Sequence, residues 1–510
     1  MAGQERRDRS STGEDASAGK GASEAAEDSL LARFAAIVGA RHVLCDAGDI
    51  AGHLVERRGL YTGATRAVVR PGSVAEVSAV LALASETGTP IVPQGGNTGL
   101  VGGQIPFEHG REIILSLSRL DAIRSVDRVG GTLTAEAGVT LRAVQEAAEG
   151  VGHIFPLSLA SEGTCQIGGN LATNAGGMQV LAYGNARDLC LGLEVVLADG
   201  RVWNGLRALR KDNTGYDLRD LFIGSEGTLG VITAAVLRLF PSPGEKVSAF
   251  VGLEQLDAVA QLYGRARSAF GSGLTRFELL PRIGVDLVLK HMDDARDPLA
   301  SAHPWYAMIE VSHGQAGGAS PAPGNDLRDT SQAGAAEAML LQVLETTLAD
   351  GIATDGTLAA SGPQEQALWD IREGMSDVQS REGGSIKNDV AVPVADVPAF
   401  ITEADRRMAA LVPGCRPVPF GHFGDGNIHY NILQPVDMAR DAFIARWDEV
   451  CGVVNEVVHA FGGTISAEHG IGRMKRHLMA EIKDPVELAL MRSVKATFDP
   501  KNILNPGKVV

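Results

Sequence analysis

The chain has 510 residues, of which 45% are hydrophobic and 21% are charged, a composition typical of a folded protein with two or three domains. Its formal net charge of −16 argues against nucleic-acid binding and against a basic membrane-surface patch, because both need clustered Lys and Arg. An anionic substrate would therefore have to be bound by a few local cations.

The cysteines and the hydrophobic segments are typical of a protein in a reducing, aqueous compartment. The five cysteines are scattered and form no C-x-x-C pair. No window approaches the roughly 18 consecutive apolar residues of a membrane helix, and the N-terminus lacks an apolar signal core. We therefore expect a cytoplasmic protein without a membrane span.

The chain begins with residues 1–28, which are rich in Gly, Ala, Ser and Glu and nearly free of bulky apolar side chains, so we expect a disordered tail. From 29 to 242, strand-like runs alternate with helical ones, which indicates an α+β or α/β domain. The strand-like runs are 67–70, 113–117 and 193–197, and a helical run is 74–83.

Two further segments complete the predicted organisation. Residues 243–435 form a second alternating block, which we interpret as a substrate or cap domain. Its Gly-, Ala-, Pro- and Asp-rich stretch at 316–335 is typical of a mobile surface loop. The last segment, 436–510, has mainly helical patterns.

A glycine-rich stretch at 90–103 stands out within the first domain. It contains five glycines in nine residues directly after a short apolar run. Such a loop lets backbone amides converge on an anion such as a phosphate, although an ordinary tight turn would show the same pattern. The chain has no G-x-G-x-x-G and no Walker motif, so a nucleotide bound here would not lie in a Rossmann fold.

Three later stretches have a similar character. Residues 156–170, 172–177 and 222–233 are dense in small residues and amides and lie beside apolar runs. Together with the glycine loop, they suit a long ligand threaded between backbone segments. With 211–218 added, the order and spacing of these stretches resemble the FAD-binding domain of the vanillyl-alcohol oxidase/PCMH superfamily, and the whole chain is similar to its D-2-hydroxyglutarate/D-lactate dehydrogenase branch.

The resemblance implies an α+β protein. It would have a PCMH-type FAD-binding domain of two α/β subdomains at 29–242, an α/β substrate or cap domain at 243–435, and a helical segment at 436–510 that returns to the flavin domain. Gly96 and Asn97 stand where some members carry a histidine that links covalently to the flavin, so we expect non-covalent FAD. The implied FAD contacts are Pro93, Gln94, Gly95, Gly96, Asn97, Thr98, Gly99, Pro156, Leu157, Gly163, Thr164, Ile167, Gly168, Asn170, Asn174, Gly176, Gly177, Tyr183, Gly184, Glu226, Gly227, Ile232 and Asn505.

A histidine pair marks the second domain. Asp425 and Gly426 are a strong two-residue hairpin signal, and pairing outward from this turn sets His422 opposite His429. Directly opposed residues have Cβ atoms about 4.5–5.5 Å apart, from which two imidazoles can hold one ion. Alternation adds Asn427 and Asn431 to the same face. Two surface histidines without a metal are the alternative.

The stretch at 462–472 offers a third ligand. Glu468 and His469 are adjacent and can serve different partners. Two imidazoles and one carboxylate leave open positions on a divalent ion, which is the pattern of a catalytic site. The resemblance implies His422, His429 and Glu468 as metal ligands and His469 as the catalytic base. Zinc is the first choice, and manganese, iron or cobalt also suits these ligands.

The cations of the second domain suggest which acid is bound. A helical reading of 368–377 places Arg372 and Ser376 on one face, and a strand at 385–390 presents Lys387, although solvated cations would give the same pattern. The resemblance implies that these three residues and Asn431 hold a distal carboxylate, which Arg can bind bidentately, and that His469 also contacts the substrate. At the position of Ser376, the 2-hydroxyglutarate enzymes of this branch usually have Thr. At the position of Asn388, they usually have Tyr or His.

The resemblance implies a metal-dependent dehydrogenase that passes a hydride from C2 of a D-2-hydroxy acid to flavin N5. D-2-hydroxyglutarate is favoured because D-lactate relatives lack a cation like Lys387. One alternative is a dehydrogenase of D-lactate or another short acid. Others are a non-catalytic flavoprotein that senses redox state and an oxidase that uses oxygen. The expected partners are the small acid and an electron-transfer flavoprotein or quinone, with a homodimer possible and no nucleic acid.

Overall fold

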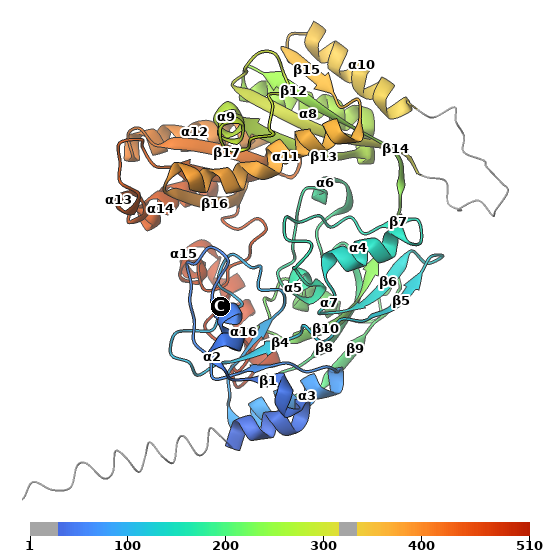
Figure 1. The fold of residues 1–510 in the computed structure, drawn as a ribbon, viewed down its shortest axis with the longest axis vertical. Helices are drawn as coiled ribbons and strands as arrows, with labels where there is room; N and C mark the ends of the chain where they lie inside the picture. Colours follow the sequence, from blue (N-terminus) through green and yellow to red (C-terminus); the bar gives the residue numbers. More distant parts are fainter. Residues whose placement is uncertain (1–28, 316–333) are drawn as a thin grey trace, which may run out of the picture.

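The computed structural model describes residues 29–315 and 334–510, which form two units that face each other (Figure 1). The first unit holds the N-terminal half and the chain's C-terminus, and the second holds the long central sheet. The predicted tail at 1–28 lies outside the described residues. The predicted mobile loop at 316–335 also lies outside them, apart from its last two residues, where helix α10 begins at Ala335.

The first unit begins with a helix at 29–38 and a four-stranded sheet in the order β1-β2-β4-β3, in which β2, β4 and β3 are parallel. Helix α3 (Val74–Thr87) connects β2 to β3. It begins where the Ser73 hydroxyl accepts a hydrogen bond from the Glu76 amide at 3.2 Å, and it ends at Gly88, whose φ is 69°. The strands are β1 (Val43–Leu44), β2 (Val68–Val69), β3 (Ile91–Gln94) and β4 (Ile113–Ser116).

A five-stranded antiparallel sheet in the order β5-β6-β10-β8-β9 completes this unit. Its central strand β10 is buried along nearly its whole length. Ile232, Ala235 and Leu237 share a hydrophobic core with helix α4 (Leu141–Glu149), and Val231 at the start of the strand belongs to the core of the first sheet. The strands are β5 (Ile123–Asp127), β6 (Thr132–Glu136), β8 (Cys190–Val196), β9 (Val202–Gly205) and β10 (Val231–Arg238). Short elements are η1 (Ala40–His42), α2 (Ala47–Leu54), β7 (His153–Ile154), α5 (Ile167–Ala172), α6 (Val180–Tyr183), α7 (Arg219–Phe222) and β11 (Phe240–Pro241).

The second unit is built on a seven-stranded antiparallel sheet in the order β15-β12-β14-β13-β17-β18-β16. Helices α8, α10, α12 and α14 cover one face, and α9 and α11 pack on part of the other. The strands are β12 (Pro243–Leu253), β13 (Leu274–Pro281), β14 (Trp305–Gln315), β15 (Asp355–Leu358), β16 (Ser385–Ala391), β17 (Arg416–His422) and β18 (Asn427–Leu433). The helices are α8 (Leu256–Phe270), η2 (Gly271–Gly273), α9 (Arg282–His291), α10 (Ala335–Ala349), α11 (Gly362–Val378), η4 (Gln379–Glu382), η5 (Val394–Asp396), α12 (Val397–Leu411), η6 (Phe423–Asp425), α13 (Arg440–Ile444) and α14 (Trp447–Ala460).

The C-terminal segment links the two units. Helix α14 packs into the core of the second unit, and Leu478 of η7 (Arg476–Leu478) and Ile482 of α15 (Met479–Ile482) still pack against that core. Helix α16 (Pro485–Phe498) packs on the first unit. Phe498 of α16 packs edge-on against Phe222 of the first unit. The last residues then pair with β3, because the Ile91 amide donates to the Ile503 carbonyl at 2.7 Å and the Asn505 amide donates to the Ile91 carbonyl at 2.8 Å.

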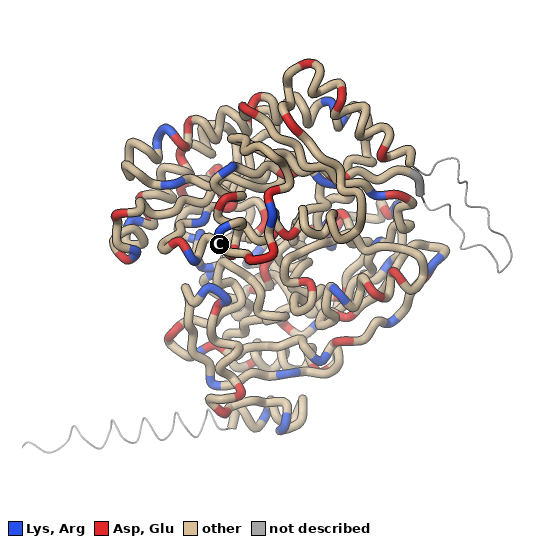
Figure 2. The backbone as a smooth tube through the Cα atoms, turned by 45° about the horizontal axis from the view of Figure 1, so that its top comes forward, with Lys and Arg blue, Asp and Glu red and all other residues tan. Residues whose placement is uncertain are grey.

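The mixture of helices and sheets confirms the predicted α+β fold class, and β2, β4, β8 and α3 lie where the sequence patterns placed them. Among the described residues, no helix has the length and hydrophobicity needed to cross a bilayer. Acidic and basic residues are interspersed over both units (Figure 2). An anionic ligand would therefore be bound by individual cations rather than by a broad basic patch.

Candidate active site

The glycine loop borders a cavity in the first unit. Thirteen of the predicted FAD contacts line this cavity, and they come from the loop after β3, from α5, from the segment before β10 and from the C-terminus. They are Pro93, Gln94, Gly95, Gly96, Asn97, Thr98, Gly99, Gly168, Asn170, Glu226, Gly227, Ile232 and Asn505. Residues that the sequence reasoning missed include Val101, Gln104, Leu117, Gln166, Gly169 and Thr173.

The cavity has the properties that a nucleotide requires. Asn97 Oδ1 and Gln166 Oε1 are buried without a hydrogen-bond partner among the described residues, and both side chains line the cavity. A Cβ atom at Gly169 would meet nothing within 4 Å. Polar atoms without partners and open space beside the backbone fit a long polar cofactor such as FAD.

Gly96 explains why this loop carries no histidine. A Cβ atom at Gly96 would lie 2.0 Å from the Thr164 carbonyl oxygen, so no side chain fits there. The next residue, Asn97, has a φ of 55° and donates through Nδ2 to the Gly52 carbonyl at 2.9 Å. The side chain of Asn97 thus anchors the loop to the segment at 52–55, and no residue of the loop is a histidine that could link to the flavin.

The other predicted FAD contacts do not line this cavity and stay predictions. They are Pro156, Leu157, Gly163, Thr164, Ile167, Asn174, Gly176, Gly177, Tyr183 and Gly184. Some are held by the protein itself: Ile167 is buried in the hydrophobic core, and Asn174 Oδ1 accepts from the Arg187 amide at 3.0 Å. Gly176 lies beside Glu468, whose Oε1 would be 3.2 Å from a Cβ atom there.

The histidine hairpin differs from the predicted one. The loop between β17 and β18 has four residues rather than two, so His422 lies opposite Asn427 and His429 lies opposite Phe420. The predicted direct pairing of the two histidines is therefore wrong. A shift of two residues keeps every side chain on its face of the sheet, and the imidazole centroids still lie 5.5 Å apart.

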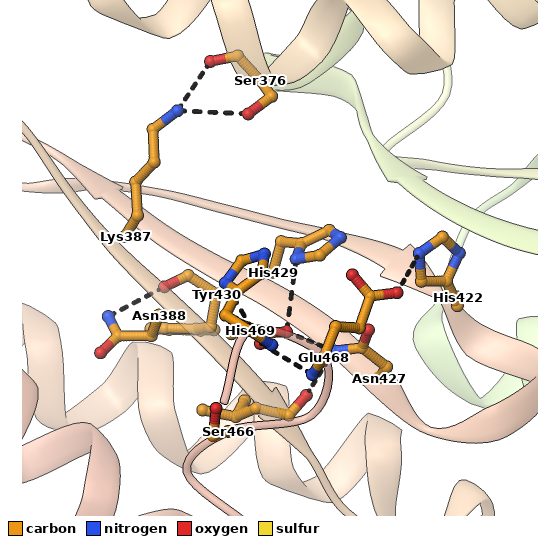
Figure 3. A network of polar contacts seen from close by, with 12 residues as sticks. Ser376, Lys387, Asn388, His422, Asn427, His429, Tyr430, Ser466, Glu468 and His469 are labelled. Atoms are coloured by element: carbon orange, nitrogen blue, oxygen red, sulfur yellow. Dashed lines mark hydrogen bonds and ion pairs between the residues drawn. The ribbon is translucent and has the colours of Figure 1, made fainter. Parts of the chain in front are cut away.

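His422, His429 and Glu468 converge on one point. One ligand atom from each lies within 4.8 Å of the others, and Glu468 Oε1 is 3.3 Å from His422 Nε2 (Figure 3). The three side chains are buried or half-buried. Two imidazoles and one carboxylate at this spacing could hold a divalent metal ion and leave positions open for a substrate.

Asp389 of β16 supports the segment that carries Glu468 and His469. Its carboxylate is 4% exposed and accepts hydrogen bonds from the backbone amides of both residues, at 3.0 and 3.1 Å. Asp389 Oδ2 also lies 3.2 Å from His469 Nδ1. Burial alone would raise the pKa of Asp389, but His469 and His429 hold it well below its usual range. An anionic partner at Nδ1 leaves Nε2 of His469 free to accept a proton.

Glu226 holds the same segment from the flavin side. Its backbone has a left-handed φ of 51°, and its carboxylate accepts from the amides of Ile471 and Gly472 at 2.7 and 2.8 Å. Burial raises the pKa of this carboxyl group. Because Asp389 belongs to the second unit and Glu226 to the first, the two carboxylates fix His469 between the units, and His469 itself lines the flavin cavity.

A buried carboxylate that the sequence reasoning missed, Glu278 of β13, lies behind the histidine pair. Its Oε1 accepts from His422 Nδ1 at 2.7 Å, and its Oε2 accepts from Arg372 Nε at 2.5 Å. Burial would raise the pKa of Glu278, but Arg372 and His422 lower it far below its usual range. Arg372 is itself 6% exposed and lies over the ring of Phe420.

The other predicted substrate contacts gather beside this group. Lys387 Nζ donates to the carbonyl and hydroxyl oxygens of Ser376 at 2.9 and 3.2 Å (Figure 3). Lys387 lies opposite Asn431 across β16 and β18, and Asn431 Nδ2 donates to Gln379 Oε1 at 3.0 Å. Burial, followed by the nearby Arg58, lowers the pKa of Lys387. In the described part of the chain, Lys387 forms no ion pair within 4.0 Å.

Asn388 does not belong to this pocket. It points to the opposite face of β16, where Nδ2 donates to the Tyr430 carbonyl at 3.1 Å and the side chain is 7% exposed. The departure from the familiar aromatic residue therefore lies on the far face of the sheet. It leaves the face that carries Lys387 and Asp389 unchanged.

Comparison with known proteins identifies the family. The profile for the FAD binding domain matches residues 65–205, and that for the C-terminal domain of FAD linked oxidases matches residues 242–509. The chain is 38% identical to a D-2-hydroxyglutarate dehydrogenase of Xanthomonas citri pv. viticola over 87% of this chain and 89% of that protein. It is 35% identical to a D-2-hydroxyglutarate–pyruvate transhydrogenase of Saccharomyces cerevisiae, over 88% and 87% of the two chains.

Solved structures extend this likeness to the fold alone. p-Cresol methylhydroxylase with substrate bound has a TM-score of 0.69 at 16% identity, with 94% of this chain and 96% of that chain covered. Alkyldihydroxyacetonephosphate synthase has a TM-score of 0.69 at 18% identity, with 94% and 85% covered. From the two profiles and the relatives, the chain belongs to the FAD-linked oxidase family and is an FAD-dependent oxidoreductase.

Proposed function

We propose that the protein is an FAD- and divalent-metal-dependent dehydrogenase that oxidises D-2-hydroxyglutarate to 2-oxoglutarate. The observation that carries this proposal is the position of His469, which lines the flavin cavity and directly follows Glu468 of the His422–His429–Glu468 cluster. A base, a candidate metal site and a flavin cavity thus meet at one point. The names of the curated relatives support the same substrate.

The donor set fits a catalytic metal. His422, His429 and Glu468 would hold the ion, with zinc as the first choice and manganese, iron or cobalt also suited to these ligands. A divalent ion in this place would supply Lewis acidity to the hydroxyl and C1 carboxylate of the substrate. The chain's own contribution is to keep the three side chains converged through Glu278 and Asp389.

The distal carboxylate of the substrate would be bound by Arg372, Lys387, Ser376 and Asn431. Lys387 supports this assignment, because its half-buried ammonium has the neutral oxygens of Ser376 as partners and no carboxylate within 4.0 Å among the described residues. A buried cation without a counter-ion is costly unless an anion binds beside it. A five-carbon dicarboxylate supplies that anion, and D-lactate does not.

His469 would act as the base. Asp389 holds its Nδ1 side, so Nε2 accepts the proton of the substrate hydroxyl while the imidazole stays oriented. The residues that line the cavity would hold FAD, whose N5 would supply the hydride acceptor for C2 of the substrate. The two units exclude water and hold these groups in line, which is the main contribution that a protein makes to hydride transfer.

Anaerobic flavin reduction tests the proposal. The FAD-loaded, metal-loaded enzyme is mixed with D-2-hydroxyglutarate, L-2-hydroxyglutarate or D-lactate, and the flavin absorbance is followed. We expect fast bleaching with D-2-hydroxyglutarate and at least tenfold lower efficiency with D-lactate. If D-lactate reduces the flavin as efficiently as D-2-hydroxyglutarate, the substrate is a short D-2-hydroxy acid. If no acid bleaches the flavin, the protein is a redox sensor.

The proposal also includes an electron acceptor and a cellular location. An electron-transfer flavoprotein or a quinone would serve as the electron acceptor, and the protein would act in the cytoplasm. The name of the Danio rerio relative, 38% identical over 88% of this chain and 79% of that protein, contains the word mitochondrial. Fractionation of the source cells tests the location.

A further inference from the structure

Glu278 connects two groups that the proposed function treats separately. It lies in the middle of β13, opposite His422 of β17, and it is completely buried. One carboxylate oxygen accepts from His422 and the other accepts from Arg372. His422 belongs to the candidate metal site, whereas Arg372 belongs to the candidate site for the distal carboxylate.

The contact with His422 fixes the tautomer of that ring. An ionised carboxylate only accepts hydrogen bonds, so Nδ1 of His422 must carry a proton. Nε2, which lies 3.3 Å from Glu468 Oε1, is then the nitrogen available to a metal ion. Carboxylates behind metal-binding histidines orient the ring and raise its basicity in this way.

The contact with Arg372 fixes the direction of the guanidinium group. Its Nε–H is used by Glu278, and the Phe420 ring lies 5.0 Å from the guanidinium carbon. In the part of the chain that the structure describes, Arg372 makes no other ion pair within 4.0 Å. The two terminal NH₂ groups of its planar fork therefore remain for a carboxylate ligand.

We infer that Glu278 is a positioning residue that sets the spacing between the metal-binding end and the distal-carboxylate end of the substrate site. The inference rests on the proposed function and goes beyond it, because it assigns the discrimination of chain length to a residue that does not touch the substrate. One rigid side chain bonded to both ends keeps their separation constant. A dicarboxylate can occupy both ends at once, whereas D-lactate has no second carboxylate to reach Arg372.

Glu310 provides a matched control. It is a buried carboxylate on the neighbouring strand β14, is 3% exposed, and accepts from Thr275 Oγ1 at 2.7 Å. It also lies 3.6 Å from Arg276, and among the described residues it forms no hydrogen bond or ion pair with the candidate metal ligands or with Arg372, Lys387, Ser376 and Asn431. Both Glu310→Gln and Glu278→Gln remove a buried negative charge from this sheet. A general effect of that removal should therefore appear in both variants, and an effect on the site should appear only in Glu278→Gln.

The experiment compares Glu278→Gln, Glu278→Asp and Glu310→Gln with the wild-type holoenzyme. Gln keeps the shape of Glu278, but its NH₂ group cannot accept a hydrogen bond, so it loses the bond to either His422 or Arg372. Asp keeps the charge, but its side chain is shorter by one C–C bond of about 1.5 Å. Zinc affinity is measured by competition with a chromogenic chelator. KM and kcat are measured with D-2-hydroxyglutarate and D-lactate at saturating zinc, and the thermal midpoint is recorded for each protein.

We expect zinc binding by Glu278→Gln to weaken about 10- to 100-fold, the range for losing a carboxylate behind a metal-binding histidine. For Glu278→Gln and Glu278→Asp we also expect KM for D-2-hydroxyglutarate to rise at least tenfold, while KM for D-lactate changes less than threefold. Glu310→Gln should leave zinc affinity and the ratio of the two KM values unchanged.

Two results would overturn the inference in different ways. If the wild-type protein binds zinc and discriminates between the acids but both Glu278 variants do the same, Glu278 is only a structural ion-pair partner. If Glu278→Gln fails to fold, Glu278→Asp decides the question by the same KM ratio. If the wild-type protein binds no metal or does not discriminate, the proposed function fails, and the inference fails with it.

Discussion

Replacing Lys387 by Met tests the assignment of the substrate most sharply. Met keeps much of the apolar stem of the side chain but removes the ammonium group, so the packing around Ser376 changes little. A hydrogen bond to a charged group contributes about 1.5–3 kcal/mol, which corresponds to about a 10- to 150-fold loss. We expect kcat/KM for D-2-hydroxyglutarate to fall by this factor and that for D-lactate to change less than threefold, because lactate has no distal carboxylate.

The assay is anaerobic stopped-flow reduction of the bound flavin over a range of concentrations of each acid. It separates the rate constant of reduction from the apparent dissociation constant of the acid. Lys246, an exposed lysine on β12 of the same unit, supplies the control. Lys246→Met should leave kcat/KM for both acids unchanged. Equal losses on both acids, or no loss on either, would refute the distal-carboxylate site.

Three other predictions test separate parts of the account. We expect Asp389→Asn to lower the rate constant of flavin reduction about 100- to 10,000-fold, the range for a general base, because His469 loses the anion that orients it; a rate constant within threefold of wild type would contradict this role. Dialysis against dipicolinate should abolish reduction by substrate and leave the FAD absorbance in place, since the cavity and the three ligands use different residues, and added zinc or manganese should restore activity; simultaneous loss of FAD would count against separate sites. Glu382 accepts hydrogen bonds from three side chains that lower its pKa to about 2, so its contribution to stability is complete above the ordinary pKa of a glutamate and is lost as the pH falls toward 2. Glu382→Gln should therefore lower the thermal midpoint at pH 7 by an amount that shrinks between pH 5 and pH 3, and a constant difference would contradict the ion pairing. The three donors are Lys290, His291 and Arg416.

The elements with strong local patterns could be predicted from the sequence. Helix α3 has a Ser cap, an apolar face and a terminal glycine within one continuous stretch. His422 and His429 are seven residues apart, and alternation in the two strands of one hairpin placed them on the same face. The register was wrong because the Asp425–Gly426 pair indicates a two-residue turn, whereas the loop has four residues: a 3₁₀ turn at 423–425 that ends at Gly426, whose φ is 81°.

Two of the three supporting carboxylates, Glu278 and Glu226, could not be predicted from local pattern. Glu278 lies 144 residues before His422, and their contact exists only because β13 and β17 become neighbours in the sheet. Glu226 lies 245 residues before Ile471 and contacts it across the two units. Asp389 was within a predicted strand, and its position two residues after Lys387 could have placed it on the same face.

The central claim is that one metal ion, bound by two imidazoles and a carboxylate, lies next to the flavin with His469 beside it. Anomalous diffraction at the zinc edge, from crystals that contain FAD and zinc, tests this claim most directly. The account predicts an anomalous peak at His422, His429 and Glu468, with the flavin ring in the cavity that His469 lines. A peak at another place, or a flavin ring on the far side of the cavity from His469, would contradict it.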